Sequence, residues 1–125
     1  MELSREVTEA NIVRAWEPGR VRVRDEWLHG HLIIAADRII SDWAVSAADR
    51  IDVAALEPAI ALRPEIILLG TGAELVLPDV ELMAQLAADA IGLEIMTTAA
   101  ACRTFNVLVH ERRRVVAALF NPAPR

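Results

Sequence analysis

The sequence predicts an α/β fold: a single three-layer domain with a mixed central sheet and an N-terminal antiparallel β meander or hairpin layer. Three apolar runs carry this prediction, at residues 66–69, 92–96 and 115–120, because such runs suit strands that are buried on both faces. The two segments between the runs show the 3.6-residue apolar period of helices and are long enough to cross over between parallel strands. Residues 64–120 are therefore predicted to form a βαβαβ unit.

The length and composition of the chain suit one soluble domain. Its 125 residues are enough for one core and few for two, so we expect a single domain over residues 11–125. Residues 1–10 are expected to form a flexible lead-in. The hydrophobic share of 54% comes without an apolar run near the roughly 20 residues that span a bilayer. The polar N-terminus also lacks the hydrophobic core of a signal peptide. These features predict a cytoplasmic protein without an integral membrane segment.

Charge and residue usage exclude several function classes. A formal net charge of −5 and a pI near 5.1 argue against binding to nucleic acid. The one local basic spot, the three arginines at 112–114, is interpreted as a solvated helix end. All 13 basic residues are arginine, so Schiff-base chemistry and a P-loop lysine are excluded. The single cysteine, Cys102, rules out an internal disulfide and a cysteine metal cage.

The first third of the chain predicts an antiparallel meander. Residues 17–20 are a turn signal, in which Pro18 presets φ and Gly19 accepts the positive φ of a type II turn. The alternation of apolar and charged residues at 21–24 is typical of a strand with one face on the core. Further strands are predicted around 27–28, 31–36 and 39–43.

Two helical segments are predicted between the meander and residue 92. Residues 46–62 favour a short or broken helix, because Asp52 is a good N-cap whereas Pro58 removes a helical hydrogen bond. A clearer helix follows Pro78, and Gly92 is predicted to supply the left-handed residue that ends it. Its expected apolar face comprises Leu82, Met83, Leu86, Ala87, Ala90 and Ile91.

The last helix is predicted to begin at Thr97 or Thr98, because either hydroxyl group can cap exposed backbone N–H groups. Its core face is expected to be Ala101, Phe105 and Leu108, flanked by Cys102 and Val109. The opposite stripe carries Arg103, Asn106 and His110 at helical spacing.

A candidate ligand site follows from this topology. Right-handed crossovers place the carboxyl ends of the first two parallel strands side by side, at the edge where open α/β sheets hold ligands. The free N–H groups and positive dipole end of the last helix would favour an anion there, with Arg103 and Asn106 as further donors. In the alternative, Arg103 pairs with Glu94 or a backbone carbonyl and only fixes the helix to the sheet. The predicted ligand or partner site comprises Gly70, Thr71, Gly72, Thr97, Thr98, Arg103 and Asn106.

Catalytic, cofactor and metal motifs are weak in this sequence. The Gly70–Gly72 segment imitates the start of a dinucleotide fingerprint, but Leu75 replaces the third glycine, so a tight turn is the better interpretation. His29 and His31 could share a strand face, yet no third metal ligand is identifiable near them. Cys102 is interpreted as a buried structural thiol. We therefore predict no catalytic residue, no cofactor and no metal.

Three segments resemble a known family: PEIILLGTG at 64–72, GLEIM at 92–96 and AACRTFNVL at 100–108. The chain is similar over these segments to the Mth-type single-domain family of undefined activity, which includes an assembly factor of mitochondrial respiratory complex I and an adipogenesis-associated protein. The resemblance implies a compact α/β fold with a mixed sheet and a β-hairpin layer. It also implies protein partners, which include membrane-complex subunits or insertion machinery. Several bacterial members carry Asp, Gly and Tyr where this chain has Thr97, Ala99 and Phe105.

Two functions from different classes follow. We favour a non-catalytic interaction or assembly-factor module for a membrane or multi-subunit respiratory complex, on the basis of the resemblance and the lack of a catalytic set. The alternative is a small anionic-ligand-binding protein or enzyme that uses the crevice between residues 70–72 and the helix starting at Thr98. We favour a non-catalytic protein over an enzyme.

Overall fold

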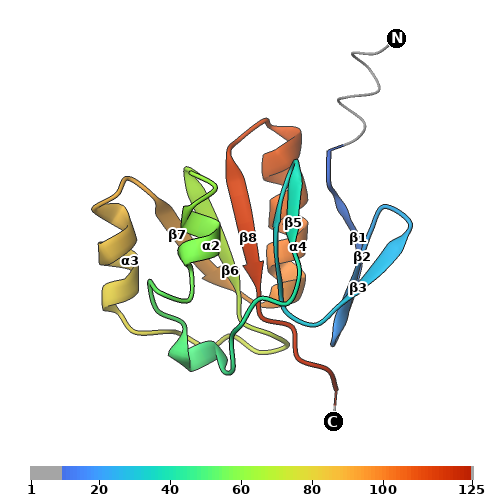
Figure 1. Ribbon diagram of the computed structural model, residues 1–125, viewed down its shortest axis with the longest axis horizontal. Coiled ribbons are helices and arrows are strands. Elements are labelled where there is room, and N and C mark those ends of the chain that lie inside the picture. Colours follow the sequence, from blue (N-terminus) through green and yellow to red (C-terminus); the bar gives the residue numbers. More distant parts are fainter. Residues whose placement is uncertain (1–9, 125) are drawn as a thin grey trace.

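The central element of the computed structural model, which describes residues 10–124, is a five-stranded mixed sheet (Figure 1). The strand order in this sheet is β5-β4-β8-β6-β7, and β1, β2 and β3 form a separate antiparallel sheet. The strands are β1 Val13–Glu17, β2 Arg20–Val23, β3 Glu26–His29, β4 Leu32–Ala35, β5 Arg38–Ile40, β6 Ile66–Gly70, β7 Gly92–Met96 and β8 Val115–Leu119. The helices are η1 Ala48–Arg50, α2 Glu57–Ile60, α3 Glu81–Ala87 and α4 Thr98–His110.

The C-terminal half is the predicted βαβαβ unit. Strand β6 pairs in parallel with both β7 and β8, and α3 and α4 are the two crossovers. The two crossovers cover opposite faces of the sheet. Helices α2 and α3 lie on one face, whereas α4 and the three-stranded sheet lie on the other (Figure 1). The mixed α/β architecture in three layers is thus confirmed.

Alternating side chains of the central strands fill two separate cores. In β6, Ile67 and Leu69 face the layer of α2 and α3, while Leu68 faces α4. In β8, Val116 faces the first layer and Ala117 the second. Because successive strand residues point to opposite faces, an uninterrupted apolar run is what a strand between two covering layers requires.

The N-terminal meander was predicted to be longer than it is. Strands β1, β2 and β3 form a meander, and Gly19 has the positive φ of +91° expected at the first turn. Strands β4 and β5, however, belong to the central sheet, where β4 pairs antiparallel with β8. The reason is visible in β4, whose four residues are all buried and would expose an apolar face in a two-layer meander.

The helix after Pro78 is shorter than predicted, and its buried apolar face is narrower. Within α3 only Leu82 and Leu86 are buried, and Met83 is exposed. The left-handed residue after the helix is Ala90, with φ of +61°, and not Gly92. Gly92 instead opens β7, where it pairs with Ile66. The chain turns two residues earlier than predicted because the N–H of Ile91 already donates to the Leu86 carbonyl, which closes the helix.

The remaining local predictions concern helix ends. Thr97 is the N-cap of α4, and its hydroxyl oxygen accepts from the N–H of Ala100. The segment 46–62 is broken as expected, into η1 and the four-residue α2 with Pro58 in its first turn. The arginines at 112–114 follow α4, which ends at His110, and lead into β8. The flexible lead-in predicted for residues 1–10 falls almost wholly outside the described residues.

Candidate functional site

The predicted site lies where β6 and β7 end. Gly70 is in register with Met96, and the N–H of Thr71 donates to the Met96 carbonyl at 2.9 Å. Two residues later the N–H of Thr98 donates to the Gly72 carbonyl, also at 2.9 Å. Five of the predicted residues, Gly70, Thr71, Gly72, Thr97 and Thr98, therefore come together at one edge of the sheet, as the parallel topology requires.

Thr98 connects three segments at this edge. Its hydroxyl oxygen accepts from the N–H of Gly72 at 2.7 Å and donates to the carbonyl of Phe120 at 2.7 Å. The side chain is fully buried. A Cβ atom on Gly70 would lie 2.9 Å from the Cα atom of Thr98, so the helix approaches the strand at a distance that only glycine allows.

Several other polar groups of this edge are also paired within the chain. The Thr71 hydroxyl donates to the carbonyl of Glu74 and accepts from the N–H of Val76. At the start of α4, the N–H groups of Thr98, Ala100 and Ala101 are all engaged. An anion that binds the N–H groups or hydroxyl groups named here would have to displace some of these hydrogen bonds. A ligand at this edge therefore stays a prediction, and its binding would cost the free energy of the hydrogen bonds that it replaces.

Arg103 and Asn106 face a different part of the molecule. Both line a groove of about 240 Å³ between α4 and β1, together with Trp16 and Cys102. The Asn106 carboxamide pairs with the backbone of Val13 in both directions, at 2.8 Å each. The Arg103 guanidinium is exposed and makes no hydrogen bond or ion pair with the part of the chain that the structure describes. The alternative pairing of Arg103 with Glu94 is thus not formed.

Cys102 lies in the floor of the same groove, and its side chain is 4% exposed. Burial raises the pKa of the thiol to about 12, although the nearby charge of Arg103 acts in the opposite direction. A thiol with this pKa holds a negligible thiolate fraction near neutral pH. The groove therefore contains no activated nucleophile at Cys102.

His31 is held by the C-terminal segment. The backbone N–H of Asn121 donates to its Nδ1 atom at 2.8 Å, and the imidazole stacks on Phe120 with ring centroids 4.6 Å apart. Partial burial lowers the pKa of His31 below its usual value. His31 thus serves as a hydrogen-bond acceptor inside the fold, and His29 is exposed on β3. Within residues 10–124, no three His, Cys, Asp or Glu side chains gather as metal ligands would.

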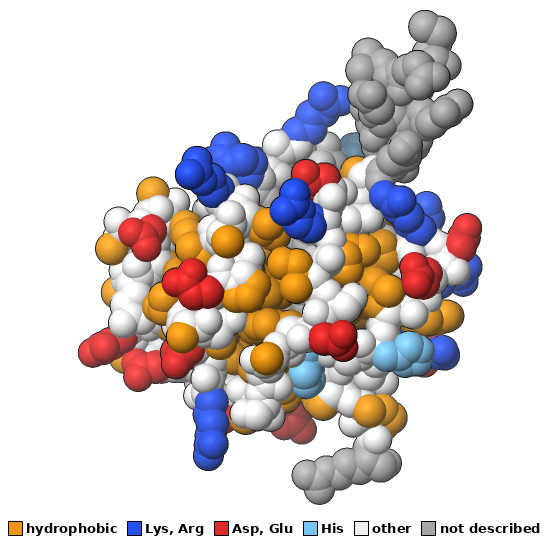
Figure 2. All heavy atoms as spheres, in the orientation of Figure 1, with side chains coloured by type: hydrophobic (Ala, Val, Ile, Leu, Met, Phe, Trp, Pro, Cys, Tyr) orange, Lys and Arg blue, Asp and Glu red, His pale blue; other side chains and the backbone are white. Residues whose placement is uncertain are grey.

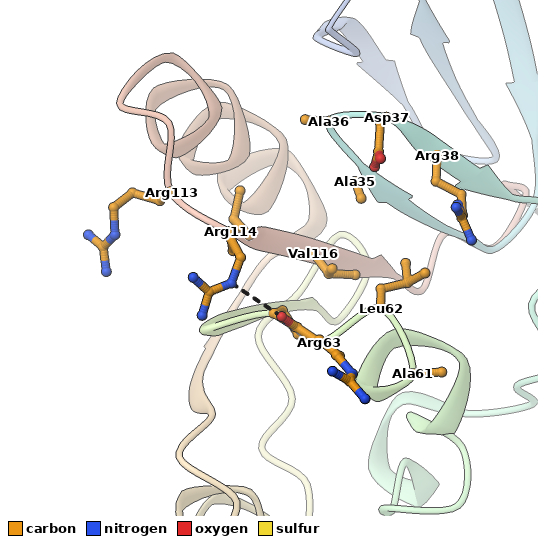
Figure 3. A pocket seen from close by; sticks show the side chains of 12 residues that line it. Ala35, Ala36, Asp37, Arg38, Ala61, Leu62, Arg63, Arg113, Arg114 and Val116 are labelled. Carbon is orange, nitrogen blue, oxygen red and sulfur yellow. Dashed lines mark hydrogen bonds between the residues drawn. The ribbon is translucent and has the colours of Figure 1, made fainter.

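Sequence reasoning missed a pocket at the opposite edge of the central sheet. A hollow of about 410 Å³ lies at the amino ends of β6 and β8, beside the turn between β4 and β5 (Figure 3). Four arginines line it: Arg38, Arg63, Arg113 and Arg114. The topology could have revealed it, because Arg63 and Arg114 each shortly precede one of two neighbouring parallel strands. In Figure 2, basic side chains gather along the same upper edge, while acidic ones are common at the lower left.

A second unpredicted feature is an exposed apolar segment between β6 and the first turns of α3. Leu75, Leu77, Val80 and Met83 are exposed to 57%, 68%, 89% and 48%, respectively. The segment follows the predicted sheet-edge site along the chain, because only Ala73 and Glu74 lie between Gly72 and Leu75. We call residues 75–83 the apolar segment below. The sequence indicated this exposure, because Leu77 and Val80 do not fall on the helical face that Leu82 and Leu86 form four residues apart.

Comparison with known proteins places the chain in a family. Residues 13–120 match the family described as "Protein of unknown function (DUF498/DUF598)". The chain belongs to this family. The match spans every strand of the structure, from β1 to β8, and both helices of the βαβαβ unit. The resemblance to the Mth-type family, which was inferred from the sequence, is also confirmed, because a solved relative is described as a Mth938-like domain.

That relative is a Bordetella pertussis protein described as a Mth938-like domain. It is 29% identical, with a TM-score of 0.77, and the alignment covers 90% of this chain and 87% of that one. A protein of Xanthomonas campestris is 34% identical, with a TM-score of 0.81, over 92% of this chain and 87% of the other. The chain therefore shares its fold with both solved proteins and about a third of its sequence with each.

Two curated proteins are also similar to this DUF498/DUF598 chain. NADH dehydrogenase [ubiquinone] 1 alpha subcomplex assembly factor 3 of Danio rerio is 28% identical over 122 residues, which cover 96% of this chain and 70% of that protein. The "13 kDa major membrane protein" of Francisella tularensis is 42% identical over 60 residues, 48% of this chain. The match spans 49% of the Francisella protein. None of the helices described in this chain has the length and apolarity needed to cross a membrane.

Proposed function

We propose that this chain is a non-catalytic protein-interaction module that serves the assembly of a membrane-bound or multi-subunit respiratory complex. The proposal is supported by homology to a complex I assembly factor over nearly the whole chain. The structural observation that carries it is the apolar segment, in which four large apolar side chains are exposed within nine residues. Large exposed apolar side chains that gather on one part of a surface are typical of protein-binding sites.

The surroundings of the apolar segment indicate the chemistry of its partner. Glu74, Asp79 and Glu81 are exposed within or beside it, and the chain as a whole is acidic. A protein segment with apolar side chains flanked by basic residues would bury the leucines and place its cations against these carboxylates. We therefore propose a subunit segment of that composition as the partner, bound during assembly.

The polar groups of the chain support a binding role over a catalytic one. The threonine hydroxyl groups at the sheet edge are engaged in hydrogen bonds that hold β6, α4 and the C-terminal segment together. The Cys102 thiol is buried, with a raised pKa. The competing proposal, a small anionic ligand at residues 70–72 and Thr98, requires these hydrogen bonds to open.

Deletion of the gene in its own cell tests the proposed function. The amount of assembled NADH dehydrogenase complex is measured by native electrophoresis of membranes with an activity stain, together with the level of its unassembled subunits. We expect the assembled complex to fall several-fold while unassembled subunits or subcomplexes accumulate. Complementation with the wild-type chain should restore it. Normal assembly of the respiratory complexes in the deletion strain would contradict the proposal.

A thermal-stability screen separates the competing proposal. The purified chain is heated with a panel of small anionic metabolites, and a ligand that binds the folded state raises the melting temperature. A metabolite whose stabilising effect disappears in Thr97→Ala, a cap variant at the sheet edge, would favour ligand binding there. Under the assembly proposal, Thr97→Ala lowers stability slightly and changes no ligand response.

A further inference from the structure

The pocket at the amino ends of β6 and β8 combines four guanidinium groups with an apolar floor. Arg38 begins β5, Arg63 precedes β6 and Arg114 precedes β8, so three distant parts of the sequence meet there. Figure 3 shows the side chains of Leu62 and Val116 between Arg38 on one side and Arg114 on the other. The pocket therefore has a cationic rim around an apolar centre.

The four arginines differ in how much of their hydrogen-bonding capacity is used. The Nε atom of Arg113 donates to Glu65 at 2.9 Å, and this hydrogen bond lowers the pKa of the Glu65 carboxyl. The guanidinium of Arg113 also points away from the others in Figure 3. The guanidinium of Arg114 donates only through its Nε atom, to the carbonyl of Arg63 at 3.4 Å. Its two terminal nitrogens remain available to a ligand.

Arg38 and Arg63 make no side-chain hydrogen bond or ion pair with any residue between 10 and 124. The rim thus holds three guanidinium groups that form no ion pair within the described residues, although the Glu65 carboxylate lies near Arg114 and Asp37 lines the pocket beside them. An excess of positive charge is unexpected in a chain with a net charge of −5. Such a site favours a carboxylate or phosphate group, which guanidinium groups bind in a planar, two-pronged manner.

The floor and the size of the pocket add a second requirement for the ligand. Leu62 is half-buried, and Ala35, Pro64 and Val116, which also line the pocket, are buried. A volume of about 410 Å³ falls in the range of small-molecule sites, roughly 300–1,000 Å³. A bare inorganic anion would leave this apolar area wet, whereas an anion with an apolar body would cover it.

We propose that this pocket binds a small amphiphilic anion, with its carboxylate or phosphate group held by Arg63 and Arg114 and its apolar body against Leu62 and Val116. The proposal is independent of the apolar segment, which lies at the other edge of the sheet. Arg38 closes the opposite side of the pocket and adds positive charge. The ligand class includes alkyl phosphates and short-chain carboxylates, and these two sources of the anion are compared directly in the test.

An NMR titration of the full chain tests the proposal. Octyl phosphate, octanoate and inorganic phosphate are added separately to the ¹⁵N-labelled protein, below the concentrations at which the amphiphiles form micelles. We expect saturable shifts confined to the amides of residues 35–38, 61–64 and 113–116, with a Kd of about 1 mM or tighter for one amphiphile. Inorganic phosphate should bind at least about tenfold more weakly, since it cannot cover the apolar floor.

Two double variants with the same change in net charge decide whether the pocket is responsible. Arg63→Gln with Arg114→Gln should weaken the amphiphile at least about tenfold, the loss expected when charged donors are removed. Arg50→Gln with Arg112→Gln removes two exposed arginines that do not line the pocket and should leave the Kd within about twofold, because the specific donors remain. The proposal is overturned by equal weakening in both variants, by unsaturable or scattered shifts, or by binding of an acidic peptide in place of the three probes. The dispersed spectrum of each variant reports that it is folded.

Discussion

The carboxamide of Asn106 pairs with both backbone groups of Val13: its oxygen accepts from the Val13 N–H, and its amide nitrogen donates to the Val13 carbonyl, each at 2.8 Å. Val13 opens β1, the edge strand of the three-stranded sheet, where the pairing with β2 is irregular. A side chain of α4 thus takes the place of a neighbouring strand. This pairing joins the N-terminal sheet to the βαβαβ unit.

Replacement of Asn106 tests that connection. Asn106→Ala leaves the N–H and carbonyl of Val13 without their partners, so the free energy of unfolding should fall by about 1–3 kcal/mol. Val107→Ala is the matched control, because Val107 is 55% exposed on the same helix, and its replacement should stay within about 0.5 kcal/mol. Chemical denaturation measures both. Equal stability of the two variants would mean that the Asn106 pairing adds nothing to the fold.

The hydroxyl of Thr98 gives a second prediction. Thr98→Val keeps the shape of the side chain but leaves the Gly72 N–H and the Phe120 carbonyl unpaired, which should cost about 1–3 kcal/mol of stability. Thr104→Val makes the same chemical change on α4 where no hydrogen bond joins the hydroxyl to the described residues, and it should cost less than about 0.5 kcal/mol. Denaturant unfolding of the pair decides. A Thr98→Val protein as stable as Thr104→Val would refute the bridging role.

His31 should make stability depend on pH. Its pKa in the folded state is lowered by burial, and its Nδ1 atom accepts a hydrogen bond that protonation at this atom would remove. A lowered folded pKa means that the contribution to stability is present above the unfolded value of about 6.5 and is lost as the pH falls toward the folded pKa. We therefore expect wild-type stability to decline as the pH falls below about 6.5, the ordinary pKa of histidine.

Two histidine variants identify the source of that decline. His31→Phe removes the titrating group and should flatten the pH dependence, whereas His29→Gln, at an exposed position, should retain it. Urea unfolding at several pH values measures the effect. A His31→Phe protein with an unchanged pH profile would assign the decline to other groups.

Cys102 should react slowly with thiol reagents in the folded state. With its pKa raised to about 12, the thiolate fraction near pH 8 is far below that of a free cysteine, whose pKa is about 8.5. Modification by a disulfide reagent should therefore be at least about 100-fold slower than in denaturant, where the thiol is free. Absorbance of the released thiolate follows both rates. Comparable rates would show that the α4–β1 groove opens readily.

The βαβαβ unit could be predicted because its signals are local. Strands β6 and β8 are apolar runs, and the capping hydroxyl of Thr97 marks the start of α4. Strand β7 lies at the edge of the sheet, and the exposed Glu94 interrupts its apolar residues. The partner of β4 could not be predicted in the same way, since its pairing with β8 joins residues more than 80 positions apart. The continuous burial of β4 was nevertheless visible in its four apolar residues, which a solvated meander would not require.

The candidate site was only partly accessible from sequence. Parallel topology brought residues 70–72 and 97–98 together, but a helical stripe does not reveal what packs against it. Asn106 therefore looked like a free ligand donor although it binds β1. The arginine pocket was missed for a similar reason: the triplet at 112–114 was judged as a linear run, and Arg38 and Arg63 join it only through the sheet.

The most direct test of the proposed assembly role removes the exposed apolar side chains while keeping the fold. Leu77→Ser with Val80→Ser should leave the melting temperature within a few degrees, because both side chains are largely exposed, and Val107→Ser is the control on a different exposed surface. Each gene is returned to the deletion strain, and the assembled NADH dehydrogenase complex is quantified on native gels. We predict that Val107→Ser restores the complex and that the folded double variant does not. Full restoration by the double variant would contradict assembly through this segment.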